Sequence, residues 1–244
     1  AFDLVLFGCI DREIAPVELR RLIEAAREVP LVVVDQQDDA LNNLPKAAAY
    51  GALTRVDGYF KREMLKGWRY PANTWPLPMS YALHKRSKRE DSLERDIPLF
   101  WAGHRKLGMR RLFLEHLERR FGFQWDEQLT PDEYSLALGR SRAALCLAGG
   151  GFDTVRYWEI PAQGALLLAE KLPIHVPYDF TDGETALLFE DVCELEARVV
   201  YTLEHPEDAA RIAAAGRNHF ERYHTSRARA LQLLARVQET LHPQ

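Results

Sequence analysis

The stretch that decides the fold runs from residue 143 to residue 170. Residues 143–148 (AALCLA) form an apolar run, three glycines follow at 149–151, residues 152–159 read FDTVRYWE, and residues 165–169 (ALLLA) form a second apolar run. This order predicts a strand, a glycine turn, a helix and another strand. A glycine turn that opens a helix presents free backbone N–H groups at the positive end of the helix dipole, where a phosphate can bind.

Two charged residues follow the glycine turn. Arg156 and Glu159 are three positions apart, so they share one face of the predicted helix. Arginine can clamp phosphate oxygens with two hydrogen bonds, and glutamate can accept hydrogen bonds from sugar hydroxyls. The alternative is a surface ion pair worth at most about 0.5 kcal/mol. The adjacent Gly149, Gly150 and Gly151 favour a nucleotide or sugar-phosphate ligand over that alternative.

The glycine turn lacks the fingerprint of a dinucleotide-binding dehydrogenase. Thr154 stands where the third glycine of the Gly-x-Gly-x-x-Gly pattern would fall, and no acidic residue ends a strand about 20 residues later. The sequence therefore gives only weak support to a dehydrogenase.

Composition limits the class of protein further. The chain has 244 residues, 47% of them apolar, which suffices for one large or two modest domains. The net charge of −4 gives no overall attraction to nucleic acid. No apolar run reaches the roughly 18 residues of a membrane span, and the first residues resemble a buried strand rather than a signal peptide. With three widely spaced cysteines and no metal-ligand spacing, these features predict a cytoplasmic protein without a metal site.

The first third of the chain predicts a parallel βαβ unit. An apolar run at residues 2–7 and another at 31–34 flank residues 16–28, whose apolar spacing is helical. Asp11 and Asp35 each come just after a predicted strand, so either could serve as a general base. Weaker elements are predicted as a short helix at 46–53 and short strands at 56–60 and 73–77, the last at an edge because of its prolines.

A second strand–glycine–helix turn begins at residue 98. The strand ends at Gly103, cations follow at Arg105 and Lys106, and a helix is expected over residues 107–120 with Arg110 in its first turn. The expected apolar face of this helix is Leu107, Leu114, Leu117 and Phe121. These residues come just after the end of a strand, so we expect two alternatives about equally. In one they bind a diphosphate, and in the other they are ordinary surface residues: Gly103, Arg105, Lys106 and Arg110. Further helices are predicted at residues 131–138, 191–203, 206–223 and 226–241.

Strands and helices therefore alternate in two blocks, separated by highly charged residues near position 90. This predicts an α/β protein of two Rossmann-like lobes, residues 1–90 and 91–244, with a short N-terminal lobe. Ligands in such folds bind beyond the carboxyl ends of the strands, and the cleft between lobes is the default site.

Several stretches match a known family. They are residues 99–103 with the basic helix that follows, residues 156–159 followed by Gly164, residues 182–184, and residues 205–227. Over residues 98–237 the chain resembles the C-terminal lobe of group 1 GT-B glycosyltransferases, in particular the bacterial CgeB-like proteins. The first half resembles an N-terminal lobe of that family through residues 3–7, 35–39 and 56–61.

The resemblance implies two facing lobes, with a nucleotide-diphosphate sugar held mainly by residues 91–244 and an acceptor held mainly by residues 1–90. Glu159 falls where the family places the glutamate of its Arg-x-x-Glu segment, which is expected to contact the donor ribose. Arg156 falls where a donor-phosphate contact is expected. Gly151 stands where many retaining members carry a second glutamate.

The predicted function is transfer of a sugar from a nucleotide-diphosphate sugar to a glycan, protein or small-molecule acceptor, without metal or cofactor. Asp11 or Asp35 would take the acceptor proton, and the cations would stabilise the departing diphosphate. The short first lobe and Gly151 leave a second hypothesis open, a glycosyltransferase-like module that binds a nucleotide or glycan without turnover. A nucleotide-sugar epimerase is a third hypothesis. Site residues expected to bind the donor are Gly103, Arg105, Lys106, Arg110, Gly149, Gly150, Gly151, Arg156 and Glu159.

Overall fold

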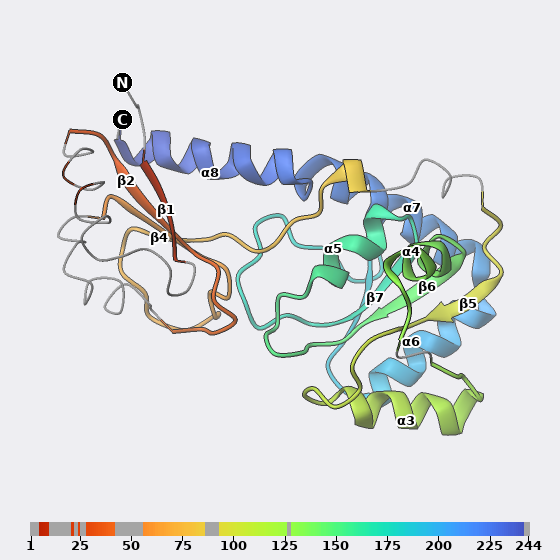
Figure 1. The fold of residues 1–244 in the computed structure, drawn as a ribbon. Coiled ribbons are helices and arrows are strands. Elements are labelled where there is room, and N and C mark those ends of the chain that lie inside the picture. The colour runs from red at the N-terminus through yellow and green to blue at the C-terminus, as the bar shows by residue number, and fades with distance from the viewer. Residues whose placement is uncertain are drawn as a thin grey trace. The chain divides into compact units, whose positions relative to one another are not determined.

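The chain folds into two compact units. The computed structural model describes residues 5–9, 21, 24, 28–41, 56–85, 93–125 and 128–241. One unit comprises Ala1–Pro78, Pro173–Pro177 and Ala230–Gln244, and the other comprises Met79–Leu172 and Tyr178–Arg229. Within the described residues each unit contains a four-stranded parallel sheet (Figure 1). The expected α/β class with two Rossmann-like units is confirmed.

The first unit has its strands in chain order. They are β1 (Val5–Cys9), β2 (Leu31–Asp35), β3 (Gly58–Lys61) and β4 (Thr74–Pro76). In β2 and β3 successive residues are buried whichever face they point to, as expected for a parallel sheet covered on both sides. The strand that contains Pro76 lies at the end of this order, which agrees with the predicted edge position.

The C-terminal helix shows why this unit is not continuous in sequence. In helix α8 (Ser226–Leu241), Leu233 and Val237 pack with Val32 of β2 and Phe60 of β3. The division expected at residue 90 assigned all of 91–244 to one lobe, whereas residues 173–177 and 230–244 belong to the first unit. The predicted helices at 16–28 and 46–53 fall mainly outside the described residues.

The second unit carries the sheet built from the deciding stretch. Its strands, again in chain order, are β5 (Ile97–Phe100), β6 (Ser141–Cys146), β7 (Leu166–Glu170) and β8 (Leu187–Phe189). Its helices are α3 (Arg110–Phe121), α4 (Pro131–Gly139), α5 (Val155–Ala162), α6 (Val192–Glu204) and α7 (Pro206–Tyr223), and a short 3₁₀ turn, η1, covers Leu83–Lys85. The predicted helices at 131–138, 191–203, 206–223 and 226–241 are confirmed to within one residue at each end.

Helix α3 begins later than its apolar spacing predicts. The expected start at Leu107 is wrong, because Gly108 has a φ of +56°, which an α-helix does not contain. Leu107 consequently lies outside the helix and is 41% exposed, so it is not part of the apolar face. Leu114 and Leu117 are fully buried as expected.

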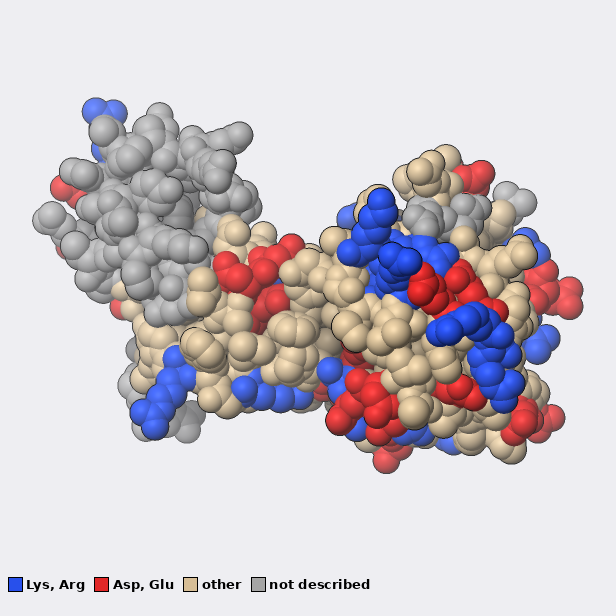
Figure 2. All heavy atoms as spheres, turned by 90° about the horizontal axis from the view of Figure 1, so that it is seen from below, with Lys and Arg blue, Asp and Glu red and all other residues tan. Residues whose placement is uncertain are grey.

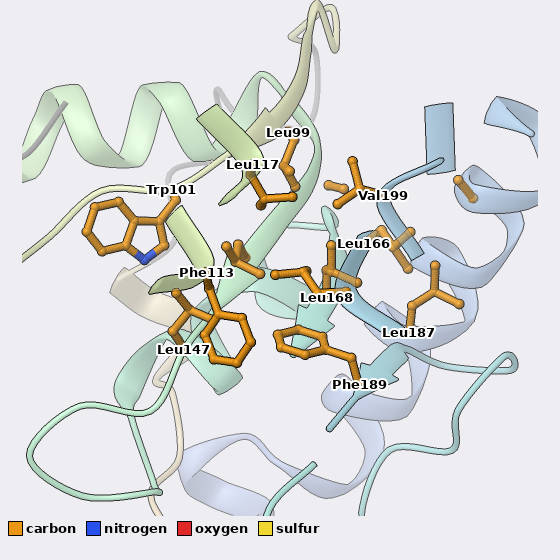
Figure 3. Close-up of a cluster of buried hydrophobic side chains, with 14 of the residues drawn as sticks. Leu99, Trp101, Phe113, Leu117, Leu147, Leu166, Leu168, Leu187, Phe189 and Val199 are labelled. Atoms are coloured by element: carbon orange, nitrogen blue, oxygen red, sulfur yellow. The ribbon is translucent and has the colours of Figure 1, made fainter. Parts of the chain in front are cut away.

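The core of the second unit lies on one face of its sheet. Figure 3 shows Leu166, Leu168 and Phe189 of the strands meeting Phe113 of α3 and Val199 of α6. The opposite face is covered from the other side, where Phe100 of β5 packs against Tyr134 of α4 with ring centroids 5.5 Å apart. Figure 1 shows α3 and α6 on one side of the sheet and α4 and α5 on the other.

Candidate functional site

The candidate site lies at the carboxyl edge of the second unit's sheet, where the loops after β5 and β6 meet. The parallel register of the two strands, with Phe100 opposite Ala144, brings these loops to the same edge. Gly103 follows β5, and Gly149 follows β6. Both belong to the residues that the sequence predicts to bind a diphosphate.

Two arginines cross between these loops. Arg156 of α5, which follows β6, reaches Gly103, and a Cβ placed on Gly103 would lie 2.5 Å from Nη2 of Arg156. Arg110 of α3, which follows β5, reaches Gly149, and a Cβ there would lie 2.5 Å from Nη2 of Arg110. Each glycine therefore makes room for the arginine of the other loop, and Gly103 also has a φ of +139°, which favours glycine.

Arg110 holds the two loops together. Its side chain is 4% exposed, and all three of its nitrogens donate to backbone carbonyls: Nε to Ala148 (2.9 Å), Nη1 to His104 (3.2 Å) and Nη2 to Leu147 (3.1 Å). Burial, followed by the nearby charge of Arg156, lowers the pKa of Arg110. Arg110 thus contributes a buried positive charge and a fixed loop geometry.

Arg156 has a different environment. Its side chain is half-buried, and its Nε is enclosed yet has no hydrogen-bond partner among the described residues. Its Cζ lies 5.9 Å from the centroid of the Tyr134 ring. Two guanidinium groups of like charge at one sheet edge repel each other, so this edge favours an anion as a third member. Among the described residues, no hydrogen bond to the enclosed Nε of Arg156 offsets this repulsion.

Glu159 lies on the same helix face as Arg156, as predicted. The Tyr134 hydroxyl donates to Oε2 of Glu159 at 3.3 Å. Burial raises the pKa of the Glu159 carboxyl above its usual value, while Arg156, the Tyr134 hydrogen bond and Lys85 act in the opposite direction. The result is a half-buried carboxylate next to the arginine pair.

The glycine turn is not directly continuous with helix α5. Gly149 N donates to Gly151 O at 2.9 Å, so this N–H closes the turn itself. The helix begins only at Val155, with Thr154 as an N-cap whose side chain makes no capping hydrogen bond. The expectation that the glycines open the helix is therefore wrong, because three residues lie between Gly151 and the start of α5. The first N–H groups of α5 still lack a side-chain cap, and Gly150 has open space around it.

The remaining predicted cations differ in their contacts. Arg105 donates to both carboxylate oxygens of Glu118, at 2.6 and 2.7 Å, in a bidentate pair. Lys106 is exposed in the same loop. Arg105 is therefore already committed to a carboxylate, whereas Lys106 extends into solvent beside it.

The two candidate bases belong to the first unit's part of the sequence. Asp35, at the end of β2, is fully buried, where the Tyr59 hydroxyl donates to its Oδ2 and Lys61 Nζ lies 3.2 Å from the same oxygen. This enclosure gives Asp35 a structural ion pair. Asp11 lies outside the described residues. The role of either acid as a base stays a prediction.

Sequence reasoning missed two residues at this edge. Glu170, the last residue of β7, accepts from Ala148 N at 2.5 Å, and burial raises the pKa of its carboxyl. Its position at the carboxyl end of a predicted strand was the available signal. Tyr134 carried no such signal, because only the packing of α4 on β5 brings it to Arg156 and Glu159.

Three further observations concern the charges, the possible metal ligands and the helices of the described residues. Figure 2 shows acidic and basic side chains interspersed on the face in view, without a continuous basic surface. Over the described ranges, no three His, Cys, Asp or Glu side chains gather as a metal ion would require. None of the described helices is long and apolar enough to cross a membrane.

Most of the second unit's sequence matches a known protein family. A family model described as glycosyl transferase-like matches residues 105–235, more than half of the chain. Comparison with curated protein sequences gives no match.

Three solved structures illustrate the shared fold. Anabaena Alr3699/HepE in complex with UDP has a TM-score of 0.62 at 14% identity, over 98% of this chain and 79% of that chain. Sucrose-phosphate synthase (tll1590) from Thermosynechococcus elongatus has a TM-score of 0.58 at 13% identity, over 98% and 74%. A glycosyltransferase from Rickettsia africae ESF-5 has a TM-score of 0.55 at 9% identity, over 99% and 98%.

Proposed function

Because this chain belongs to the glycosyl transferase-like family and is a glycosyltransferase of the GT-B fold, we propose that it transfers a sugar from a nucleoside-diphosphate sugar to an acceptor hydroxyl without a metal ion. The observation that carries this proposal is the Arg110–Arg156 pair between Gly103 and Gly149. The presence of UDP in the HepE structure supports a uridine nucleotide as the first donor to test.

The donor diphosphate binds at the arginine pair. The half-buried guanidinium of Arg156 contacts its oxygens, and Arg110 adds a fixed charge behind the loops. The uncapped N–H groups at the start of α5 add donors aligned with the helix dipole. Glu159 accepts from the ribose hydroxyls.

The transfer step uses the same charges. The acceptor oxygen forms a bond to the anomeric carbon as the bond from that carbon to the phosphate oxygen breaks, and the acceptor proton passes to a carboxylate. Negative charge builds up on the departing nucleoside diphosphate, where Arg156, Arg110 and the helix N–H groups stabilise it. This stabilisation replaces the role that a divalent cation fills in other transferases. Asp11 is the proposed proton acceptor, because Lys61 and Tyr59 enclose Asp35.

The experiment that tests donor binding is thermal unfolding with UDP and GDP. A nucleotide at about 100 times its Kd stabilises the folded protein by about 2.7 kcal/mol, so the bound nucleotide raises the melting temperature. Arg156→Ala is expected to remove most of that rise, and Arg111→Ala, an exposed arginine paired only with Glu115 among the described residues, is expected to retain it. An equal rise in Arg156→Ala and wild type would contradict the assignment.

One observation favours a second candidate, a module that binds the donor without turnover. Gly151 stands at the position of a second acid in many retaining relatives, and it carries no side chain that could act on the sugar. Release of UDP from UDP-glucose, measured across a panel of sugar and protein acceptors, separates the two functions. Tight binding with no release in any acceptor favours the module.

A further inference from the structure

Tyr134 is held in place by a well-formed helix start. Thr130 and Glu133 form a reciprocal capping box at the beginning of α4, and Tyr134 N donates to Thr130 O at 2.9 Å. The ring packs against Phe100 of β5, with centroids 5.5 Å apart. The side chain is therefore anchored both by its own helix and by the sheet.

From this anchored position Tyr134 contacts both of the residues proposed to bind the nucleotide, Glu159 and Arg156. Its hydroxyl donates to Glu159 Oε2 at 3.3 Å, and in the described part of the chain no other hydrogen bond to that carboxylate is present. Its ring faces the Arg156 guanidinium, with Cζ 5.9 Å from the centroid. An arginine on an aromatic face gains a cation–π attraction, which is stronger when the pair is desolvated.

These contacts leave the binding atoms available. A carboxylate can accept on both oxygens, so with Oε2 bound to Tyr134, Oε1 remains for a sugar hydroxyl. No hydrogen bond joins Tyr134 to Arg156 in the described part of the chain, so the ring contact leaves the N–H groups of the guanidinium for an anion. Tyr134 thus orients both groups without competing for the ligand.

We propose that Tyr134 is a positioning residue for the nucleoside of the donor, with its hydroxyl orienting Glu159 toward the ribose and its ring orienting Arg156 toward the diphosphate. This inference rests on the proposed donor site. It predicts that the ribose hydroxyls are recognised by Glu159 when Tyr134 orients it. It also predicts that the Tyr134 hydroxyl affects binding of the ribose, whereas the Tyr134 ring affects binding of the diphosphate.

The test compares UDP with 2′,3′-dideoxy-UDP by isothermal titration calorimetry. Wild type is expected to bind UDP about tenfold more tightly than the dideoxy nucleotide, a difference of about 1.4 kcal/mol. Tyr134→Phe keeps the ring and removes the hydroxyl, so it is expected to lose most of that tenfold preference while binding dideoxy-UDP within about twofold of wild type.

Tyr201→Phe is the matched control. Tyr201 lies on α6 of the same unit, and its hydroxyl also donates to a carboxylate, that of Asp208. It is expected to leave both affinities unchanged. An equal loss of UDP and dideoxy-UDP binding in Tyr134→Phe would mean a structural effect only, and no loss of either would mean that the hydroxyl is idle; either result overturns the inference.

A second variant tests the ring. Tyr134→Leu is expected to weaken the binding of dideoxy-UDP as well. In an Arg156→Ala background the same substitution is expected to cause no further loss of dideoxy-UDP binding, because the ring acts through Arg156. A full additional loss in that background overturns the ring's role, and circular dichroism checks that each variant is folded. If wild type binds neither UDP nor GDP, the proposed function fails first, which distinguishes that failure from failure of the Tyr134 inference alone.

Discussion

At Gly103 and Gly149 a single added methyl group would collide with an arginine. The two collisions differ in kind, because Gly103 also has a φ of +139°, which L side chains rarely adopt, whereas Gly149 is restricted only by Arg110. At Gly103 the cost of a side chain is therefore both backbone strain and displacement of Arg156. The proposed phosphate contact thus depends on a residue with no functional group of its own.

Gly103→Ala is expected to destabilise the protein by about 1–3 kcal/mol through backbone strain and to weaken UDP binding about tenfold by displacing Arg156. Calorimetric titration and thermal melts measure the two effects. Gly122→Ala is the matched control, since Gly122 has a φ of +72° at the end of α3 but nothing within 4 Å. It should lose stability while keeping UDP affinity. A Gly103→Ala protein with wild-type affinity would show that Arg156 does not need this space.

Glu159 links stability to pH. Burial raises the pKa of Glu159 in the folded protein, so the folded state holds its proton more tightly than the unfolded chain. The stability that the Glu159 carboxyl contributes is therefore lost as the pH rises from its pKa in the unfolded chain, about 4.3, through its raised pKa in the folded protein. Glu159→Gln carries no such titration, so its melting temperature should exceed that of wild type at pH 7, and the gap should close near pH 4.

Thermal melts of both proteins between acidic and neutral pH measure this gap. The same variant should bind UDP less tightly, because a neutral amide is a weaker acceptor for ribose hydroxyls than a carboxylate. A gap that widens toward low pH would have the wrong sign and contradict the burial argument.

At the scale of elements, the site depends on how the loops after β5 and β6 are joined. Arg110 donates to carbonyls in both loops, and Glu170 at the end of β7 accepts from Ala148 N. The peptide groups on either side of Ala148 are thus held by side chains of opposite charge. This fixes the approach to Gly149 more firmly than the turn's own hydrogen bond would alone.

Arg110→Met is expected to lower the free energy of unfolding by about 3 kcal/mol, or roughly 6–12 °C in melting temperature, because three backbone carbonyls lose a charged donor. Differential scanning calorimetry measures the change. Arg111→Met, one residue along α3, removes only an exposed pair with Glu115 at i,i+4 and should cost at most about 0.5 kcal/mol. Equal effects of the two substitutions would refute the role of Arg110 as a connection between loops.

At the scale of the whole molecule, the net charge of −4 contrasts with the positive donor edge. The proposed attraction for a diphosphate is therefore local, arising from Arg110, Arg156 and the start of α5 rather than from the overall field. Within the described residues these groups all belong to the second unit, so the proposed donor contacts do not depend on residues of the first.

If these groups replace a metal ion, chelation should have little effect. UDP affinity and sugar transfer are expected to change by less than about twofold when excess EDTA is added, since the cations are covalently part of the chain. Titrations with and without EDTA, followed by added Mg²⁺ or Mn²⁺, measure this. A loss with EDTA that Mg²⁺ or Mn²⁺ restores would mean that a metal ion takes part.

The sequence by itself determined the order of strands and helices in the second unit, because hydrophobic periodicity and helix-start residues act over a few positions. It also placed Arg156 and Glu159 on one helix face, since three positions make nearly one turn. The start of α3 was predicted too early because apolar spacing does not report the positive φ of Gly108.

Only the tertiary structure showed which charges are held by other groups of the chain. Arg110 and Arg156 look alike in sequence, yet one donates to three backbone carbonyls and the other keeps an unpartnered Nε. Tyr134 and Glu170 enter the site only through packing across the sheet. The physical reason is that strand register and helix packing bring together residues far apart in the chain, and no local pattern carries that information.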